Sequence, residues 1–312
     1  MAERILAITP CHNDGWAVSA LAASMAAQQL RAVDWIIVDD NSDDDTPEQL
    51  AEVERSVPFA TVLRRDRPPG RRIGEKARAV MAGRAAMSSM QRYDLVAILD
   101  ADVVLPDDYF RRIAAEFAAD PGLGVCGGTY REPGSAGDRS GRAAGHHVPG
   151  PAQVFRATVF DAVGGYSPLP FGGDDVESVT RARLLGWRTR PLHSVTYSHR
   201  RRMGTGGHGS ALRADFNLGR QDHDLGTSPP FELVKILRHV TRRPVVLASI
   251  ARLAGFVEGS VRRRPRSVDQ EYVDYVRCEQ RSRLRDEWRG VTRSAARVVR
   301  RTPVPSGGSR AA

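Results

Sequence analysis

The sequence predicts an α/β protein in which helices flank a mostly parallel sheet and a helical appendage follows. Over about the first two hundred residues, short apolar runs alternate with helix-period segments, a pattern typical of crossover connections between parallel strands. The run at residues 95–99 (LVAIL) is wholly apolar, which indicates a central strand covered on both faces. Beyond about residue 200 the pattern becomes mostly helical.

The expected elements follow one another along the chain. We expect strands at residues 5–9, 34–39, 60–64, 95–99 and 123–129. We expect helices at residues 16–28, 74–90, 106–118 and 176–185, and another beginning at Thr46, where a capping hydroxyl precedes a proline. The Gly-, Ser- and Arg-rich stretch at residues 133–150 predicts a long loop.

These patterns divide the chain into three parts. We expect residues 1–205 to form the α/β domain and residues 206–290 a helical region. Residues 291–312, which include two prolines and two glycines, are expected to be a disordered basic tail.

Composition limits the classes of protein that need be considered. A hydrophobic content of 41% in 312 residues is enough for a core, and a net charge of +9 favours an anionic partner. However, only Lys76 and Lys235 of the 46 basic residues are lysines, so the charge looks like a coding bias and carries little weight. The three cysteines form no Cys-x-x-Cys pair, which favours a reducing cytoplasm over a disulfide framework or zinc site. No apolar stretch reaches the length of a membrane span, and the N-terminus does not resemble a signal peptide.

Two predicted strands end in acidic clusters, at residues 38–46 (VDDNSDDDT) and 99–104 (LDADVV). Ligands of open parallel sheets bind at the carboxyl ends of strands, where both clusters lie. Clustered carboxylates repel one another unless a cation compensates, and Mg²⁺ or Mn²⁺ with oxygen ligands would bridge the protein to a diphosphate.

Structural roles are the alternative for several of these acids. Asp43, Asp44 and Asp45 precede a helix and could be caps, and Asp39 could brace the turn after its strand. Asp100 and Asp102 have no obvious packing role, so the functional interpretation is favoured there.

The order of four motifs resembles glycosyltransferase family 2, which has the GT-A fold. The motifs are VDDNS at 38–42, LDAD at 99–102, VGGY at 163–166 and GGDD at 172–175, the last followed by Arg181. The resemblance covers about residues 3–200. It implies an inverting, metal-dependent hexosyltransferase that uses a nucleotide-diphosphate sugar, with residues 1–205 as the nucleotide-sugar-binding catalytic domain.

The resemblance also implies residue roles. It assigns Asp100 and Asp102 to the metal, and it assigns the following residues to the nucleotide: Pro10, His12, Asn13, Asp40, Lys76, Asp100 and Ala101. The sequence departs from the family at His12, where tyrosine is common, and at Met81, where asparagine is common. As a compact cation Lys76 suits phosphate, although it could also lie on a solvated helix face. His199 could be a third metal ligand or a structural histidine.

The GGDD segment is the candidate for acid–base chemistry. Asp174 and Asp175 open a predicted helix, whose dipole and free amides favour ionised carboxylates. Asp175 matches the family's catalytic base, whereas Asp174 could also be an ordinary cap. Arg181 could orient the acids or only pair with Glu177. Arg200 to Arg202, with the glycines that follow them, could form a lid over the donor phosphates.

The C-terminal helices have two interpretations. Residues 231–237 and 245–257 are apolar or amphipathic, and arginines accompany them at Arg238, Arg242, Arg243 and 262–264. The region could pack on the catalytic domain, or it could contact an anionic membrane that presents a lipid-linked or cell-envelope glycan acceptor.

Other classes fit the sequence less well. A dinucleotide oxidoreductase needs Gly-x-Gly-x-x-Gly after the first strand, where the sequence has a single glycine. A sugar-nucleotide-forming nucleotidyltransferase normally has a glycine-rich basic loop directly after the first strand, and this sequence lacks one there. A nucleic-acid-binding protein would explain the charge, but the aromatic residues do not cluster on basic strands.

Overall fold

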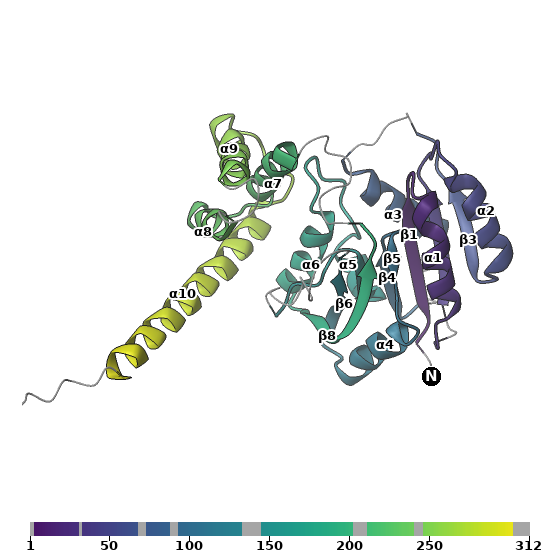
Figure 1. Ribbon diagram of the computed structural model, residues 1–312, viewed down its shortest axis with the longest axis horizontal. Helices are drawn as coiled ribbons and strands as arrows, with labels where there is room; N and C mark the ends of the chain where they lie inside the picture. The colour runs from purple at the N-terminus through teal and green to yellow at the C-terminus, as the bar shows by residue number, and fades with distance from the viewer. Residues whose placement is uncertain are drawn as a thin grey trace, which may run out of the picture.

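The fold is built on one mixed eight-stranded sheet flanked by helices (Figure 1). The computed structural model describes residues 3–30, 33–67, 73–87, 93–132, 145–201, 211–239 and 246–301. The strands are β1 (Ile5–Cys11), β2 (Val33–Asp39), β3 (Ala60–Arg64), β4 (Leu95–Leu99), β5 (Val103–Val104), β6 (Leu123–Arg131), β7 (Ala152–Arg156) and β8 (Arg188–His199). Their order in the sheet is β3-β2-β1-β4-β7-β6-β8-β5.

The sheet has a parallel half and a mixed half. Strands β3, β2, β1 and β4 are parallel, as the alternating sequence pattern predicts. Strand β7 runs antiparallel to both β4 and β6, β8 is parallel to β6, and β5 is antiparallel to β8. The predicted α/β class is therefore confirmed.

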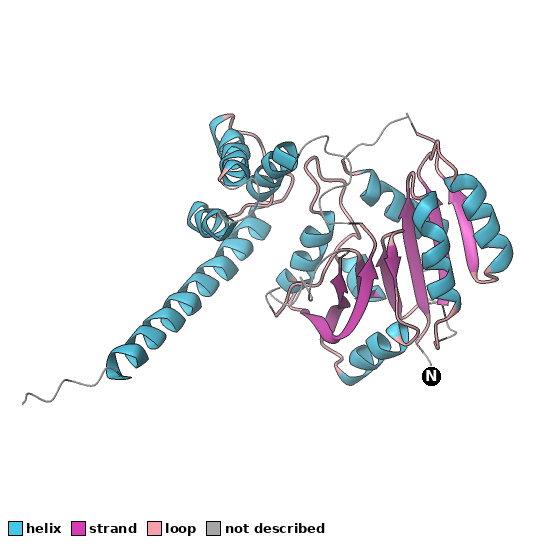
Figure 2. Ribbon diagram, in the orientation of Figure 1, coloured by secondary structure: helices cyan, strands magenta, loops and turns pink. Residues whose placement is uncertain are grey.

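Helices cover both faces of the sheet (Figure 2). They are α1 (Gly15–Ala26), α2 (Thr46–Ser56), α3 (Glu75–Ala86), α4 (Tyr109–Ala119), α5 (Ala157–Ala162) and α6 (Asp174–Leu184). Successive strand residues face opposite sides, so in β1 Ile5 and Ala7 pack with α1, α2 and α4, while Leu6 and Ile8 pack with α3, α5 and α6. Burial on both faces explains the continuous apolar runs in the sequence.

Four more helices form the C-terminal region: α7 (Ala211–Asp224), α8 (Pro229–His239), α9 (Leu247–Val261) and α10 (Gln270–Arg301). A small apolar cluster that includes Leu169, Leu225 and Tyr272 joins this region to the α/β domain. Helix α10 continues through Arg301, so residues 291–301 are helical, contrary to the predicted disorder. No proline or glycine interrupts this segment, and arginine and alanine favour helix. The rest of the predicted tail lies outside the described residues.

The order of the strands places a crevice at the ends of β1 and β4. Strand β1 lies between β2 and β4, and the chain forms β2 and β3 on one side before it returns to β4 on the other. Such a switch in strand order leaves an opening at the carboxyl ends of the two central strands. The last residues of β1 and the turn after it contain residues 10–14, and the segment after β4 contains residues 100–102.

Candidate active site

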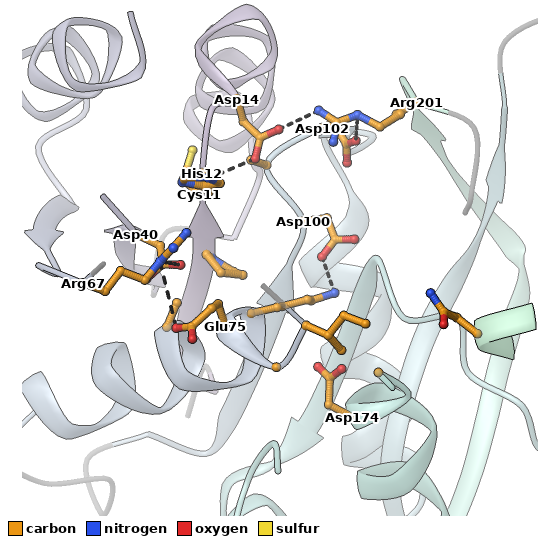
Figure 3. Close-up of a pocket in the computed structure, with 18 of the residues that line it drawn as sticks. Cys11, His12, Asp14, Asp40, Arg67, Glu75, Asp100, Asp102, Asp174 and Arg201 are labelled. Atoms are coloured by element: carbon orange, nitrogen blue, oxygen red, sulfur yellow. Dashed lines mark hydrogen bonds and ion pairs between the residues drawn. The ribbon is translucent and has the colours of Figure 1, made fainter. Parts of the chain in front are cut away.

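A cavity of about 500 Å³ lies at the carboxyl ends of β1 and β4. The turns after these strands, the first turns of α3 and α6, and helix α7 contribute to its wall (Figure 3). The lining includes eight of the predicted site residues: Pro10, His12, Asp40, Lys76, Asp100, Ala101, Asp102 and Asp174.

Asp100, Asp102 and His199 form a group that could hold a metal ion. One ligand atom from each of these residues lies within 4.8 Å of the others. The two carboxylates follow β4, and the antiparallel pairing of β5 with β8 sets Val103 opposite His199. The imidazole Nε2 lies 3.2 Å from Asp102 Oδ1.

Asp102 and His199 stabilise each other's charged form. Burial alone would raise the pKa of Asp102, but hydrogen bonding to His199 and the positive charge there hold it below its usual value. Burial would likewise lower the pKa of His199, but the Asp102 carboxylate raises it above the ordinary value. The pair therefore favours an ionised carboxylate, as metal binding requires, whereas the raised pKa of His199 means that the imidazole must lose its proton before it can bind a metal.

Lys76 crosses the cavity to the same acidic group. Its Nζ lies 2.6 Å from Asp100 Oδ1. Burial would lower the pKa of Lys76, but Asp100, Asp174 and Asp175 outweigh burial and raise it. Lys76 follows Gly74, which caps α3 with a φ of 85°, a conformation that glycine adopts without strain.

Asp174 and Asp175 occupy different environments at the start of α6. Asp174 lines the cavity and is 8% exposed, and among the described residues its Oδ2 has no hydrogen-bond partner. Burial raises its pKa to about 7, against the opposing charge of Lys76. Asp175 lies outside the lining, with its carboxylate against Gly150, where an added methyl group would overlap Oδ2.

The opposite end of the cavity holds a second charged cluster. Asp40 is buried and pairs with Arg65 and with Arg67, whose Nε lies 2.6 Å from Oδ2. Glu75 accepts hydrogen bonds from Arg65 at 2.8 and 2.9 Å. Carboxylate acceptors beside guanidinium donors can bind a nucleobase edge, which carries both N–H and carbonyl groups.

Other predicted site residues have structural contacts. Asn13 hydrogen-bonds to Ser42 and Asp43 and so braces two loops rather than lining the cavity. Arg181 pairs with Glu177 and with Asp269 at 2.9 Å, outside the cavity. Asp39 accepts a hydrogen bond from the Ser42 amide, as its alternative role predicts. Arg202 lies outside the described residues, as do Arg242 and Arg243.

The cavity lining also includes Arg201, which belongs to the predicted lid segment, and residues that had not been predicted, among them Asp14, Arg213 and Asn217. Arg201 reaches Asp14 at 2.7 Å and Asp102 at 3.5 Å, and Asp14 also lines the cavity (Figure 3). Helix α7 contributes Arg213 and Asn217. Asp14 directly follows the predicted nucleotide-binding turn, so it could have been chosen, whereas no local pattern indicates Arg213 or Asn217.

The sheet, the acid-lined cavity at its switch point and the lysine beside it define the architecture of a GT-A nucleotide-sugar transferase. Residues 6–150 match the model of a family described as glycosyl transferase family 2. The resemblance predicted from the motifs is thus confirmed over these residues, and the match indicates a glycosyltransferase.

Solved structures support the fold. A mannosyltransferase from Pyrobaculum calidifontis, in complex with GDP-Man and Mn²⁺, has a TM-score of 0.56 at 16% identity over 96% of this chain and 86% of its own. TarS from S. aureus, in complex with UDP, has a TM-score of 0.53 at 12% identity over 91% of this chain and 92% of its own. At such identities the likeness establishes the fold alone.

No curated protein matches the sequence. Within the described residues, no helix is long and apolar enough to cross a membrane.

Proposed function

We propose that this protein is an inverting, metal-dependent glycosyltransferase that moves a sugar from a nucleotide-diphosphate sugar to an acceptor hydroxyl. The observation that carries the proposal is the convergence of Asp100, Asp102, His199 and Lys76 at one end of a cavity whose other end holds Asp40 with two arginines. A diphosphate would lie at the first end and a nucleobase at the second.

The donor set suits a divalent cation. Asp100, Asp102 and His199 offer two carboxylates and one imidazole, a set that Mn²⁺ accepts and in which Mg²⁺ would rely mainly on the carboxylates. A bound cation would neutralise charge on the leaving diphosphate. Lys76 adds a protein cation beside the same phosphates, and Arg201 holds both Asp102 and Asp14 in position.

The base is proposed to be Asp175. In an inverting transfer the acceptor hydroxyl attacks the anomeric carbon from the side opposite the diphosphate. The base that takes the proton of this hydroxyl must therefore lie beyond the donor cavity. Asp175 is next to the lining residue Asp174 but outside the lining itself. Asp174 lines the donor cavity itself, so it is not proposed as the base. It would instead hydrogen-bond to the donor sugar.

The donor, acceptor and compartment are part of the proposal. The similar structures contain GDP-Man in one case and UDP in another, so guanosine and uridine donors are the first to test. We propose a glycan or lipid-linked acceptor of the cell envelope, reached from the cytoplasmic side by peripheral contact with the membrane. The free thiols of Cys11, Cys126 and Cys278 are compatible with a reducing compartment.

Calorimetry with nucleotide sugars tests the proposal directly. GDP-Man and UDP-sugars are titrated with and without Mn²⁺, and the product's anomeric configuration is determined by NMR after turnover. We expect one donor to bind in a Mn²⁺-dependent manner and its anomeric configuration to invert. A protein that binds no nucleotide sugar, or forms one from sugar phosphate and nucleoside triphosphate, would contradict the proposal.

A further inference from the structure

Exposed apolar side chains gather on helices α8 and α9. Of the fourteen large hydrophobic residues that are exposed in the described part of the chain, seven lie on these two helices. We call this surface the α8–α9 face, and it consists of Leu233, Leu237, Leu247, Ile250, Leu253, Val257 and Val261. A concentration of this kind usually marks an interaction site.

Helix α9 has two clearly different sides. Gly255 and Phe256 face α7, where a methyl group added at Gly255 would overlap the Phe216 carbonyl oxygen. The other side includes Ile250, 55% exposed, and Val261, 74% exposed. The exposed apolar side chains on this side include those of Leu247, Ile250, Val257 and Val261, which are separated by three, seven and four residues. In a helix these spacings place the side chains on one stripe.

The charged residues of α9 are withdrawn from this stripe. Arg252 is buried and pairs with Asp222 and Glu232. Glu258 accepts contacts from Arg220, Arg262 and Arg264, so three guanidinium groups share one carboxylate. The face is therefore apolar, and the cluster at the end of α9 keeps an excess of positive charge.

The sequence around the α8–α9 face is strongly basic. Residues 229–266 contain nine lysines or arginines and two glutamates, so most of the protein's excess positive charge lies in this segment. Arg263 is the second residue after α9 and is exposed. An apolar helix face with arginines at its edge suits the boundary between the headgroups and the acyl chains of an anionic membrane. The apolar side chains would contact the acyl chains, and the arginines would contact the anionic headgroups.

The same helices are connected to the donor cavity through α7. Arg213 and Asn217 of α7 line the cavity, and α9 packs closely on α7 at Gly219 and Gly255. In Figure 1 α8 and α9 lie beyond α7, away from the sheet. If α9 bound to a surface, α7 would therefore keep the donor cavity at a fixed position relative to that surface.

We propose that the α8–α9 face docks on an anionic lipid bilayer and so presents the donor cavity to an acceptor at the bilayer surface. The docking stands on the exposed face and its charge, while the role in presenting an acceptor rests on the proposed transferase function.

Vesicle co-sedimentation without any donor tests the docking. The whole protein is mixed with phosphatidylcholine vesicles that contain or lack phosphatidylglycerol, at low and high salt. We expect binding to the anionic vesicles that weakens as salt rises. Absence of binding to anionic vesicles at low salt would overturn the proposal.

Variants locate the contact. Ile250→Glu combined with Val257→Glu should weaken vesicle partition about tenfold or more, and Arg263→Gln about fivefold. Leu185→Glu is the matched control, because Leu185 is 52% exposed at the end of α6 and should leave partition unchanged. Thermal melting and solution binding of the nucleotide check that each variant is folded.

Two further outcomes would also overturn the docking. One is equal partition of the double variant and the wild type. The other is that the wild type is a dimer, the double variant is a monomer and neither binds vesicles. The face would then join two copies of the chain. Because these measurements use no donor, failure of the transferase proposal would appear separately, as loss of nucleotide-sugar binding.

Discussion

Lys76 Nζ lies 2.6 Å from Asp100 Oδ1, so a protein cation contacts one of the three residues that could hold a metal. Asp100 would then meet two cations when a metal binds, and the ammonium group would be free to turn towards the donor phosphates. The Lys76–Asp100 pair thus links helix α3 to the turn after β4 across the cavity.

Lys76→Met is expected to weaken binding of the nucleotide diphosphate about tenfold, because a phosphate loses its protein cation. Lys76→Arg, which keeps the charge, should recover part of the affinity. Calorimetry measures both.

Chemical labelling gives a test of Lys76 without mutation. The chain has only two lysines, so acetylation followed by mass spectrometry can compare Lys76 with Lys235. Donor with Mn²⁺ should protect Lys76 and leave Lys235 unchanged. Equal labelling of Lys76 with and without donor would argue against the contact.

Removal of the metal or of its ligand is expected to stop transfer. A chelator and Asp102→Ala should each lower kcat about a hundredfold or more, because the charge on the leaving diphosphate is then uncompensated. Quenching of the electron paramagnetic resonance signal of Mn²⁺ on addition of the protein reports metal binding directly. This quenching should be lost in Asp102→Ala. Asp107→Ala is the control and should retain both quenching and turnover, because Asp107 is exposed, contacts Gln29 and does not line the cavity.

Asp175→Asn is expected to preserve donor binding while kcat falls about a hundredfold to ten-thousandfold, because the acceptor hydroxyl loses its base. Asp174→Asn should change donor affinity more than Asp175→Asn does. Donor titration and steady-state kinetics of both variants separate the roles. Full turnover in Asp175→Asn would mean that the base is a different residue.

Asp174 should make stability depend on pH. Its pKa in the folded protein is raised to about 7 from an ordinary 3.8, so between these values the folded state keeps a proton that the unfolded state has lost. Stability therefore falls as pH rises through this range, and Asp174→Asn removes that fall. Relative to the wild type, the variant should gain about 1 to 3 kcal/mol between pH ~4 and pH ~7.

Urea unfolding in the presence of chelator measures this effect across the range. Asp66→Asn serves as the control, because its side chain is 94% exposed. Parallel pH profiles for the wild type and Asp174→Asn would contradict the prediction.

Gly255→Ala is expected to destabilise the protein by about 1 to 3 kcal/mol, because the added methyl group overlaps the Phe216 carbonyl oxygen and separates α7 from α9. Gly145→Ala is the control, since no atom of the described residues lies within 4 Å of the added carbon there. Urea unfolding compares the two. If both variants unfold alike, α7 and α9 do not pack as closely as described.

Local sequence determined the strands and the acids at their ends. The run at residues 95–99 is β4 itself, because an uninterrupted apolar run suits a strand buried on both faces. Asp100 and Asp102 follow directly from its end, so their position at the rim of the sheet could be predicted. Pro10, His12 and Asp40 could be predicted in the same way, because each comes at or just after a strand that the pattern identifies.

Tertiary structure alone decided which distant side chains complete the site. His199 reaches Asp102 because β8 pairs with the short strand β5, which the local pattern did not predict. Arg181 pairs with Glu177, as the alternative interpretation predicted, but it also reaches Asp269, 88 residues further along the chain. Arg213 and Asn217 enter the cavity because α7 packs against the α/β domain. Periodicity and capping report interactions within a few residues, whereas these contacts depend on the packing of elements far apart in sequence.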